Sequence, residues 1–164
     1  MTAPDRLRVA VLASAGLLSD GLLEHLAGRG HEVVIVPRRA GGVQRWMSAL
    51  RARRVVAAQR PDLVLTDLGC AGLAAFVAGG VPVALVVAPA DAAALPASRP
   101  PWHPAARALA RAACAVCAFE DDALRLAFNG APPARIRTAA DAAGQDPSHA
   151  RIEYLLFAAA RGAT

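Results

Sequence analysis

The sequence predicts an α/β fold in which helices cover both faces of one parallel sheet of about six strands. Six short apolar runs alternate along the 164 residues with segments of helical periodicity. Most of the runs are almost wholly apolar, which is typical of parallel strands buried on both faces. Between Arg60 and Ala88 a strand, a helix and another strand follow in few residues, which predicts a right-handed crossover.

One domain is expected to span residues 1–164. This length supports one core and is too short for two. Hydrophobic residues make up 55% and aromatic residues 4%, so small side chains suit close packing of helices on the sheet. No apolar run approaches the ~20 residues of a membrane span, and Met1–Arg8 has no apolar stretch like that of a signal peptide. We therefore expect a soluble, cytoplasmic protein.

The first two strands are separated by a capped helix. Arg8–Leu12 is the first strand, and Ser19 or Asp20 can cap the helix that follows it. Glycines at 28–30 end that helix, one of them in the left-handed conformation, and Glu32–Val36 forms the second strand. The inner face of the helix is expected to carry Leu22, Leu23 and Leu26.

The second helix is expected over Val43–Gln59. Its apolar stripe consists of Val43, Trp46, Met47 and Leu50, and its arginines are Arg45, Arg51, Arg53 and Arg54. The simplest interpretation is a core stripe opposite a solvated face. An alternative is a helix that contacts a membrane surface or an anionic ligand, with Trp46 at the boundary. Because Trp46 falls on the stripe itself, core packing is favoured.

The central unit places a small-residue helix, Cys70–Val77, between the strands Leu63–Leu65 and Val81–Val87. The prolines that follow predict a long loop over Ala90–Pro104, and loops of this length are often functional. The remaining elements are a helix at Ala105–Ala112, a strand at Ala113–Ala118, a helix at Asp121–Asn129, a strand at Arg135–Thr138 and an amphipathic helix at Ala150–Ala160, within a C-terminal segment at 148–161. The last helix displays Ile152, Leu155, Leu156 and Phe157.

Charge and cysteine content exclude several classes of chemistry. The net charge is +5, all 18 basic residues are arginine, and mechanisms that need a lysine are therefore excluded. The arginines are spread along the chain, which argues against a nucleic-acid binder, although anionic ligands fit. An odd count of three cysteines indicates free thiols. Cys114 and Cys117 lie three apart on a strand and point to opposite faces, so we expect core thiols and no metal site.

Two familiar α/β site types are missing from the sequence. Dinucleotide-binding domains need G-x-G-x-x-G after the first strand, whereas this chain has Ser14-Ala15-Gly16 followed by leucines. The stretch RPDLVLTDL resembles the strand that bears the phosphorylated Asp of response regulators, with Asp67 in that place. A working receiver also needs acidic residues after the first strand and a lysine, and this chain has Ala13, Ser14 and no lysine.

Six short motifs occur in order at the starts of the predicted strands. They are RVAVL at 8–12, GHEV at 30–33, RPDLV at 60–64, GVPV at 80–83, RAACAV at 111–116 and GAPPARIR at 130–137. Their order and spacing resemble the N-terminal, acceptor-side Rossmann-like domain of family-4-type glycosyltransferases with the two-domain GT-B fold. The resemblance covers Arg8 to Gly144. We expect the Rossmann-like strand order 3-2-1-4-5-6.

The resemblance implies either the acceptor-side half of a split glycosyltransferase or a non-catalytic relative. Ala88-Pro89 stands where the family has a His that contacts the reacting sugar, Phe119 replaces a Ser, and the nucleotide-sugar-binding C-terminal domain is missing from these residues. We therefore expect no catalytic residues, no cofactor and no sugar transfer by the isolated chain. The alternative is a small-molecule-binding or regulatory protein-interaction module that kept the fold.

Candidate ligand-binding residues lie after the strands, where α/β sheets bind ligands. They are Ser14, Ala15, Gly16, Arg38, Arg39, Asp67, Asp91 and Glu120. The loop at 14–16 is the best candidate for binding an anion, with the side chains of Arg38 and Arg39 as additional ligands. The three carboxylates can accept hydrogen bonds from sugar hydroxyls. The simpler interpretation of each is a helix cap or a solvated turn.

Partners are expected on two grounds. The resemblance implies a nucleotide-sugar or sugar-acceptor ligand and a donor-domain partner chain. The apolar residues Trp46, Met47, Trp102 and Phe157 look exposed, which predicts a homo-oligomer or another covering partner. Peripheral membrane contact through the arginines of the second helix stays an open alternative, and no nucleic acid is expected.

Overall fold

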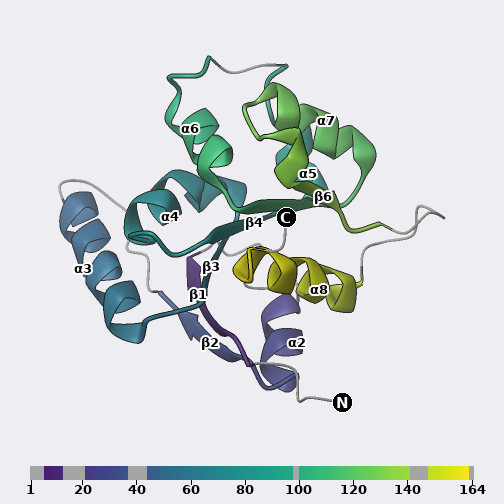
Figure 1. The fold of residues 1–164 in the computed structure, drawn as a ribbon. Helices are drawn as coiled ribbons and strands as arrows, with labels where there is room; N and C mark the ends of the chain where they lie inside the picture. The colour runs from purple at the N-terminus through teal and green to yellow at the C-terminus, as the bar shows by residue number, and fades with distance from the viewer. Residues whose placement is uncertain (1–5, 13–20, 37–43, 98–99, 141–147, 163–164) are drawn as a thin grey trace.

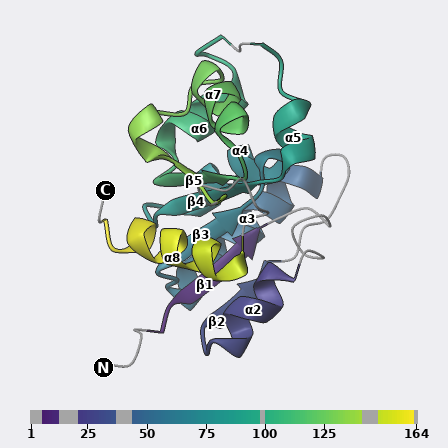
Figure 2. The same cartoon turned by 90° about the vertical axis from the view of Figure 1, so that its right-hand side faces the viewer.

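A computed structural model gives the fold for residues 6–12, 21–36, 44–97, 100–140 and 148–162, with only the backbone of 44–48 described. Its centre is one six-stranded sheet in which every pair of neighbouring strands is parallel. Helices cover both faces of the sheet (Figures 1 and 2), which confirms the predicted three-layer α/β/α architecture. No helix in these residues is both long and apolar enough to cross a bilayer.

The six strands lie at nearly the predicted positions. They are β1 (Arg8–Leu12), β2 (Glu32–Ile35), β3 (Leu63–Thr66), β4 (Val83–Val87), β5 (Cys114–Cys117) and β6 (Ile136–Thr138). β1, β3 and β5 are buried along almost their whole length, whereas the edge strands β2 and β6 are partly exposed. The inner strands are thus buried on both faces, as their apolar runs predict, whereas the two edge strands are not.

The predicted strand order 3-2-1-4-5-6 is wrong. The observed order is β2-β1-β3-β4-β5-β6, with Val9 of β1 opposite Leu63 and Val64 of β3 opposite Val83. Both orders permit right-handed crossovers, so the apolar runs alone do not distinguish them. The direction of winding reverses between β1 and β3, and this pair is the topological switch point at which α/β sheets bind ligands.

The helices divide between the two faces of the sheet. They are α2 (Leu22–Gly28), α3 (Gln44–Gln59), α4 (Ala71–Val77), α5 (Pro89–Ala93), α6 (Pro104–Arg111), α7 (Glu120–Phe128) and α8 (His149–Ala160), with short 3-10 turns η1 (Leu68–Cys70) and η2 (Pro133–Arg135). α2 and α8 share one core cluster with the sheet, and the other two clusters hold residues of α3, α4, α5, α6 and α7. Figure 1 shows α2 and α8 together on one side.

Two expected loop and cap assignments are corrected by the structure. The predicted loop Ala90–Pro104 contains helix α5, which Pro89 begins at the first helical position, where a proline costs no hydrogen bond. The N-cap of α2 is Gly21, with φ of 80°, and not Ser19 or Asp20, which lie outside the described residues. The end of α2 agrees with prediction, because Gly30 has a φ of 90°.

The buried face of α3 also differs from prediction. Leu50 is 51% exposed, while Ala49, Ala52 and Val56 are buried. Ala52 and Val56 lie in the same cluster as Ala74 and Val77 of α4, so close contact between the two helices selects small side chains over leucine. The side chains of Trp46 and Met47 lie outside the description.

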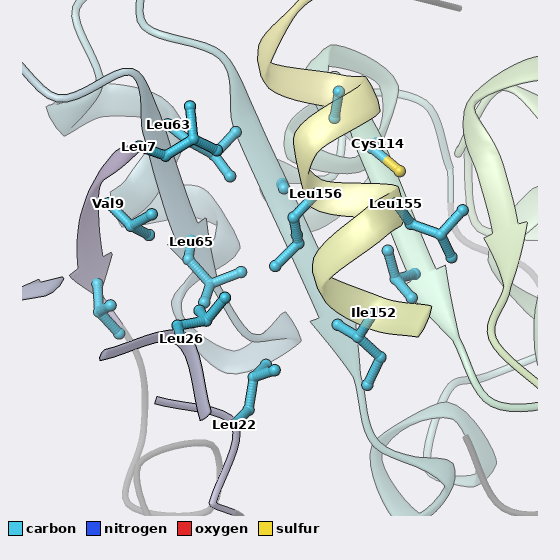
Figure 3. Packing of buried hydrophobic residues seen from close by; sticks show 14 of the residues in the cluster. Leu7, Val9, Leu22, Leu26, Leu63, Leu65, Cys114, Ile152, Leu155 and Leu156 are labelled. Atoms are coloured by element: carbon cyan, nitrogen blue, oxygen red, sulfur yellow. The ribbon is translucent and has the colours of Figure 1, made fainter. Parts of the chain in front are cut away.

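α8 covers the part of one sheet face that α2 leaves open. The crossovers from β2 to β6 place their helices on the face opposite α2, and α8 returns to the α2 side. In the resulting cluster Ile152, Leu155 and Leu156 pack with Leu63 and Cys114. Figure 3 shows these side chains between α8 and the strands. Phe157, expected to be exposed, is partly buried, and its ring contacts His31 at 4.7 Å between centroids.

Candidate functional site at the carboxyl ends of the strands

Thr66 and Asp67 lie where β3 ends, next to the end of β1. The hydroxyl of Thr66, fully buried, donates to the carbonyl oxygen of Leu12 at 2.7 Å and ties the two strand ends together. Asp67 is 3% exposed, and its Oδ1 accepts from the backbone N–H of Cys70 at 2.9 Å. Asp67 is therefore the N-cap of η1, which leads directly into α4.

Replacing Asp67 with alanine is expected to lower the free energy of unfolding by about 0.5–2 kcal/mol, the usual cost of a lost N-cap. Urea unfolding followed by circular dichroism measures the change. Asp91→Ala is the matched control, because Asp91 is exposed in the first turn of α5 and no side-chain hydrogen bond caps that helix. Equal effects of the two substitutions would contradict a capping role for Asp67.

The other two predicted carboxylates begin helices farther along the sheet. Asp91 lies in the first turn of α5 after β4, and Glu120 is the first residue of α7 after β5. Both are exposed. Each carries a negative charge at the positive end of a helix, which is the simpler interpretation that the sequence offered. Asp67, Asp91 and Glu120 thus follow successive strands at the same edge of the sheet.

The remaining predicted site residues, Ser14, Ala15, Gly16, Arg38 and Arg39, lie outside the described residues. β1 and β2 are parallel neighbours, with Val11 opposite Ile35, so the chain leaves both strands at one edge of the sheet. This edge is also where β3 ends at Thr66.

Two residues near the loop after α5 have structural roles. His103 caps α6, because its Nδ1 accepts from the N–H of Ala105 at 3.2 Å. Asn129, which the sequence analysis missed, is fully buried at the end of α7 and donates from Nδ2 to the carbonyl oxygens of Pro96 at 3.0 Å and Arg125 at 2.8 Å. The helix was predicted to end at Asn129, before Gly130, but the bond to Pro96, 33 residues earlier, has no local signal. Trp102 is 69% exposed, as expected.

The cysteines are free, buried thiols, as predicted. Cys114 belongs to the core cluster of α2 and α8, and Cys117 to the cluster on the opposite face. Burial raises the pKa of Cys114, and burial together with Asp122 and Cys114 raises the pKa of Cys117 to about 12. A protonated thiol is a weak nucleophile, so neither residue suits covalent catalysis.

A charged cluster between α2 and α8 was not found from the sequence. Glu153 of α8 contacts His25 Nε2 at 2.8 Å, His31 Nε2 at 2.9 Å and Arg29 Nε at 3.6 Å. The N–H of Leu7 donates to His31 Nδ1 at 3.3 Å, so Nε2 of His31 carries the hydrogen that binds Glu153. Burial raises the pKa of Glu153, but the hydrogen bonds from both histidines and the charge of Arg29 outweigh burial and lower it.

The contacts of this cluster connect α8 to the end of α2. His31 and Glu153 are both buried, and the two carboxylate oxygens of Glu153 are divided between the two histidines, Oε1 for His31 and Oε2 for His25. Within the part of the chain that the structure describes, no group of three or more acidic, histidine or cysteine side chains is placed to hold a metal ion. Because Glu153 lies on α8 and His25 on α2, we expect these contacts to stabilise the packing of the two helices.

No protein-family model matches this sequence. No curated protein matches it either.

Proposed function

We propose that this chain is a non-catalytic relative of the acceptor-side domains of GT-B glycosyltransferases, and that it binds a small ligand at the carboxyl edge of β1 and β3. The ligand class is a nucleotide sugar or a sugar acceptor. The strand order supports the location, because the switch point of a doubly wound sheet is where ligands bind.

The proposal that the chain is non-catalytic is supported by the hydrogen bonds that the polar side chains at this edge already make. Thr66 and Asp67 are both buried. The hydroxyl of Thr66 donates to the end of β1, and the carboxylate of Asp67 caps η1. Ala88-Pro89, where the resembled family has a catalytic His, forms the start of α5 instead. The polar side chains described beside the switch point thus serve the scaffold rather than proton transfer.

The second candidate is the acceptor half of a two-chain transferase. The order of the six sequence motifs favours it, because those motifs resemble an acceptor-side domain and not a general α/β protein. The two candidates differ when a donor-side chain is co-expressed with this one. Sugar transfer in the presence of the donor-side chain is expected only if this chain is half of a split enzyme.

Binding is tested by a ¹H–¹⁵N NMR titration with UDP-glucose and GDP-mannose as probes. We expect shifts that cluster at residues 66–70 and at the start of α5, with no comparable shifts at the amino ends of the strands. Shifts confined to the amino ends, or no shifts with either probe, would contradict the proposed ligand and site.

The purified chain is expected to release no nucleoside diphosphate from either probe above the rate without protein. The physical reason is that the described carboxylates at this edge are helix caps or exposed helix-start residues, without a base held against a nucleophile. A coupled assay for UDP or GDP measures the rate. Turnover that co-purifies with the protein and is lost in Asp67→Asn would overturn the non-catalytic assignment.

A further inference from the structure

A groove runs between α4 and α6 on the face opposite α8. It consists of two hollows of about 250 Å³ each, which share Ala75, Ala108 and Arg111 in their lining. The small side chains of Gly72, Ala75 and Ala108 leave room for larger side chains from outside. We call this feature the α4–α6 groove.

The rim of the α4–α6 groove is cationic and apolar. Arg107 and Arg111 line it, and within the described residues neither forms an ion pair. Phe76, which is 38% exposed, lines the same groove, and the guanidinium of Arg53 from α3 lies 5.5 Å from the centre of its ring. No carboxylate lines either hollow. An occupant of complementary chemistry carries large apolar side chains next to acidic ones.

Helix α7 presents that chemistry on its outer surface. Leu124 and Phe128 are 58% and 68% exposed, and they lie four residues apart on one stripe of the helix. Asp121, also exposed, lies one turn before Leu124 on the same stripe, and exposed Glu120 precedes it. Arg125 is turned toward α5, where it donates to the carbonyl oxygen of Ala93 at 3.2 Å. The exposed stripe of α7 is therefore acidic at its start and apolar beyond.

We propose that a second copy of this chain occupies the α4–α6 groove, with α7 of each copy lying in the groove of the other. Leu124 and Phe128 fill the space above the small residues of the floor, and Asp121 faces Arg107 and Arg111. Both surfaces belong to the same helical layer (Figure 1). A two-fold axis that passes between them therefore makes the contact twice and closes the dimer.

The test is a charge swap measured by light scattering and sedimentation over a concentration series. We expect the unaltered chain to form a dimer, and Arg111→Glu and Asp121→Arg each to weaken it by about tenfold or more. The combined variant restores dimerisation, because the two charges are exchanged across the interface. This restoration also shows that loss in the single variants does not come from misfolding.

Arg151→Glu is the matched control, because Arg151 is an exposed arginine on α8, on the other face of the sheet. Its dimerisation is expected to equal that of the unaltered chain. The proposal is overturned by a monomer throughout the series, by a monomer that instead binds phosphatidylserine vesicles, or by a dimer that both single variants leave intact.

Discussion

The Glu153→Ala substitution is expected to lower the free energy of unfolding by about 2–4 kcal/mol at neutral pH. It removes the acceptor for His25 and for His31, whose side chain is 1% exposed. The Nε2–H of His31 is then buried without a partner, and α8 loses its hydrogen bond to His25 of α2. Urea unfolding followed by circular dichroism measures the loss.

Glu24→Ala is the control for Glu153→Ala, because Glu24 is an exposed glutamate on α2, in the same layer. A surface substitution of this kind is expected to change stability by about 0.5 kcal/mol or less. If both alanine variants lie within that range, the cluster does not hold α8 in place.

The pH dependence of the cluster follows from the lowered pKa of Glu153. A carboxylate whose folded pKa lies below its ordinary 4.5 contributes stability that is present above that pH and is lost as the pH falls below it. The difference in stability between the unaltered chain and Glu153→Gln should therefore be largest near neutrality and shrink below pH 4.5. Among the described residues, His25, His31 and Arg29 are the charged or titratable groups that contact Glu153. A difference in stability that grows as the pH falls would contradict a lowered pKa for Glu153.

The Leu156→Ala substitution is expected to destabilise the fold by about 2–5 kcal/mol, the range for removing a leucine side chain from a packed core. Leu156 is 2% exposed and belongs to the cluster that joins α8 to Leu63 and Leu65 of β3. Its loss opens a cavity beside a strand in the middle of the sheet. Thermal and urea unfolding both report the change.

Tyr154→Ala is the control for Leu156→Ala. Tyr154 lies two residues earlier on α8 and is 64% exposed, so its truncation removes little buried surface. A loss of stability in Tyr154→Ala as large as that in Leu156→Ala would mean that α8 does not pack on the sheet through the face described here.

The sequence predicted the six strands because their signal is local. Val9–Leu12 of β1 and Leu63–Leu65 of β3 are continuous apolar runs, and such runs are characteristic of strands covered on both faces. The order of the strands depends on which neighbour β3 pairs with, and no local pattern carries that information. Leu50 was assigned to the core of α3 for a related reason, since hydrophobicity indicates an inward face but not that the contact with α4 requires alanine.

Less of the candidate site could be predicted. Asp67 was identified by its place at the end of a strand, and its role as a cap follows from the turn after it. The cluster around Glu153 gave no signal, because His25 and His31 precede it by 128 and 122 residues. Interactions across such separations depend on the whole fold, and no motif of fixed spacing encodes them.

The return of α8 to the α2 side has a kinetic consequence. Contacts between positions as far apart as 25 and 153 are formed only after a long stretch of chain has been ordered, and such contacts slow folding. We therefore expect docking of α8, which covers Leu63 and Leu65, to be a late step in folding. Leu156→Ala should accordingly raise the unfolding rate and leave the folding rate almost unchanged in stopped-flow measurements.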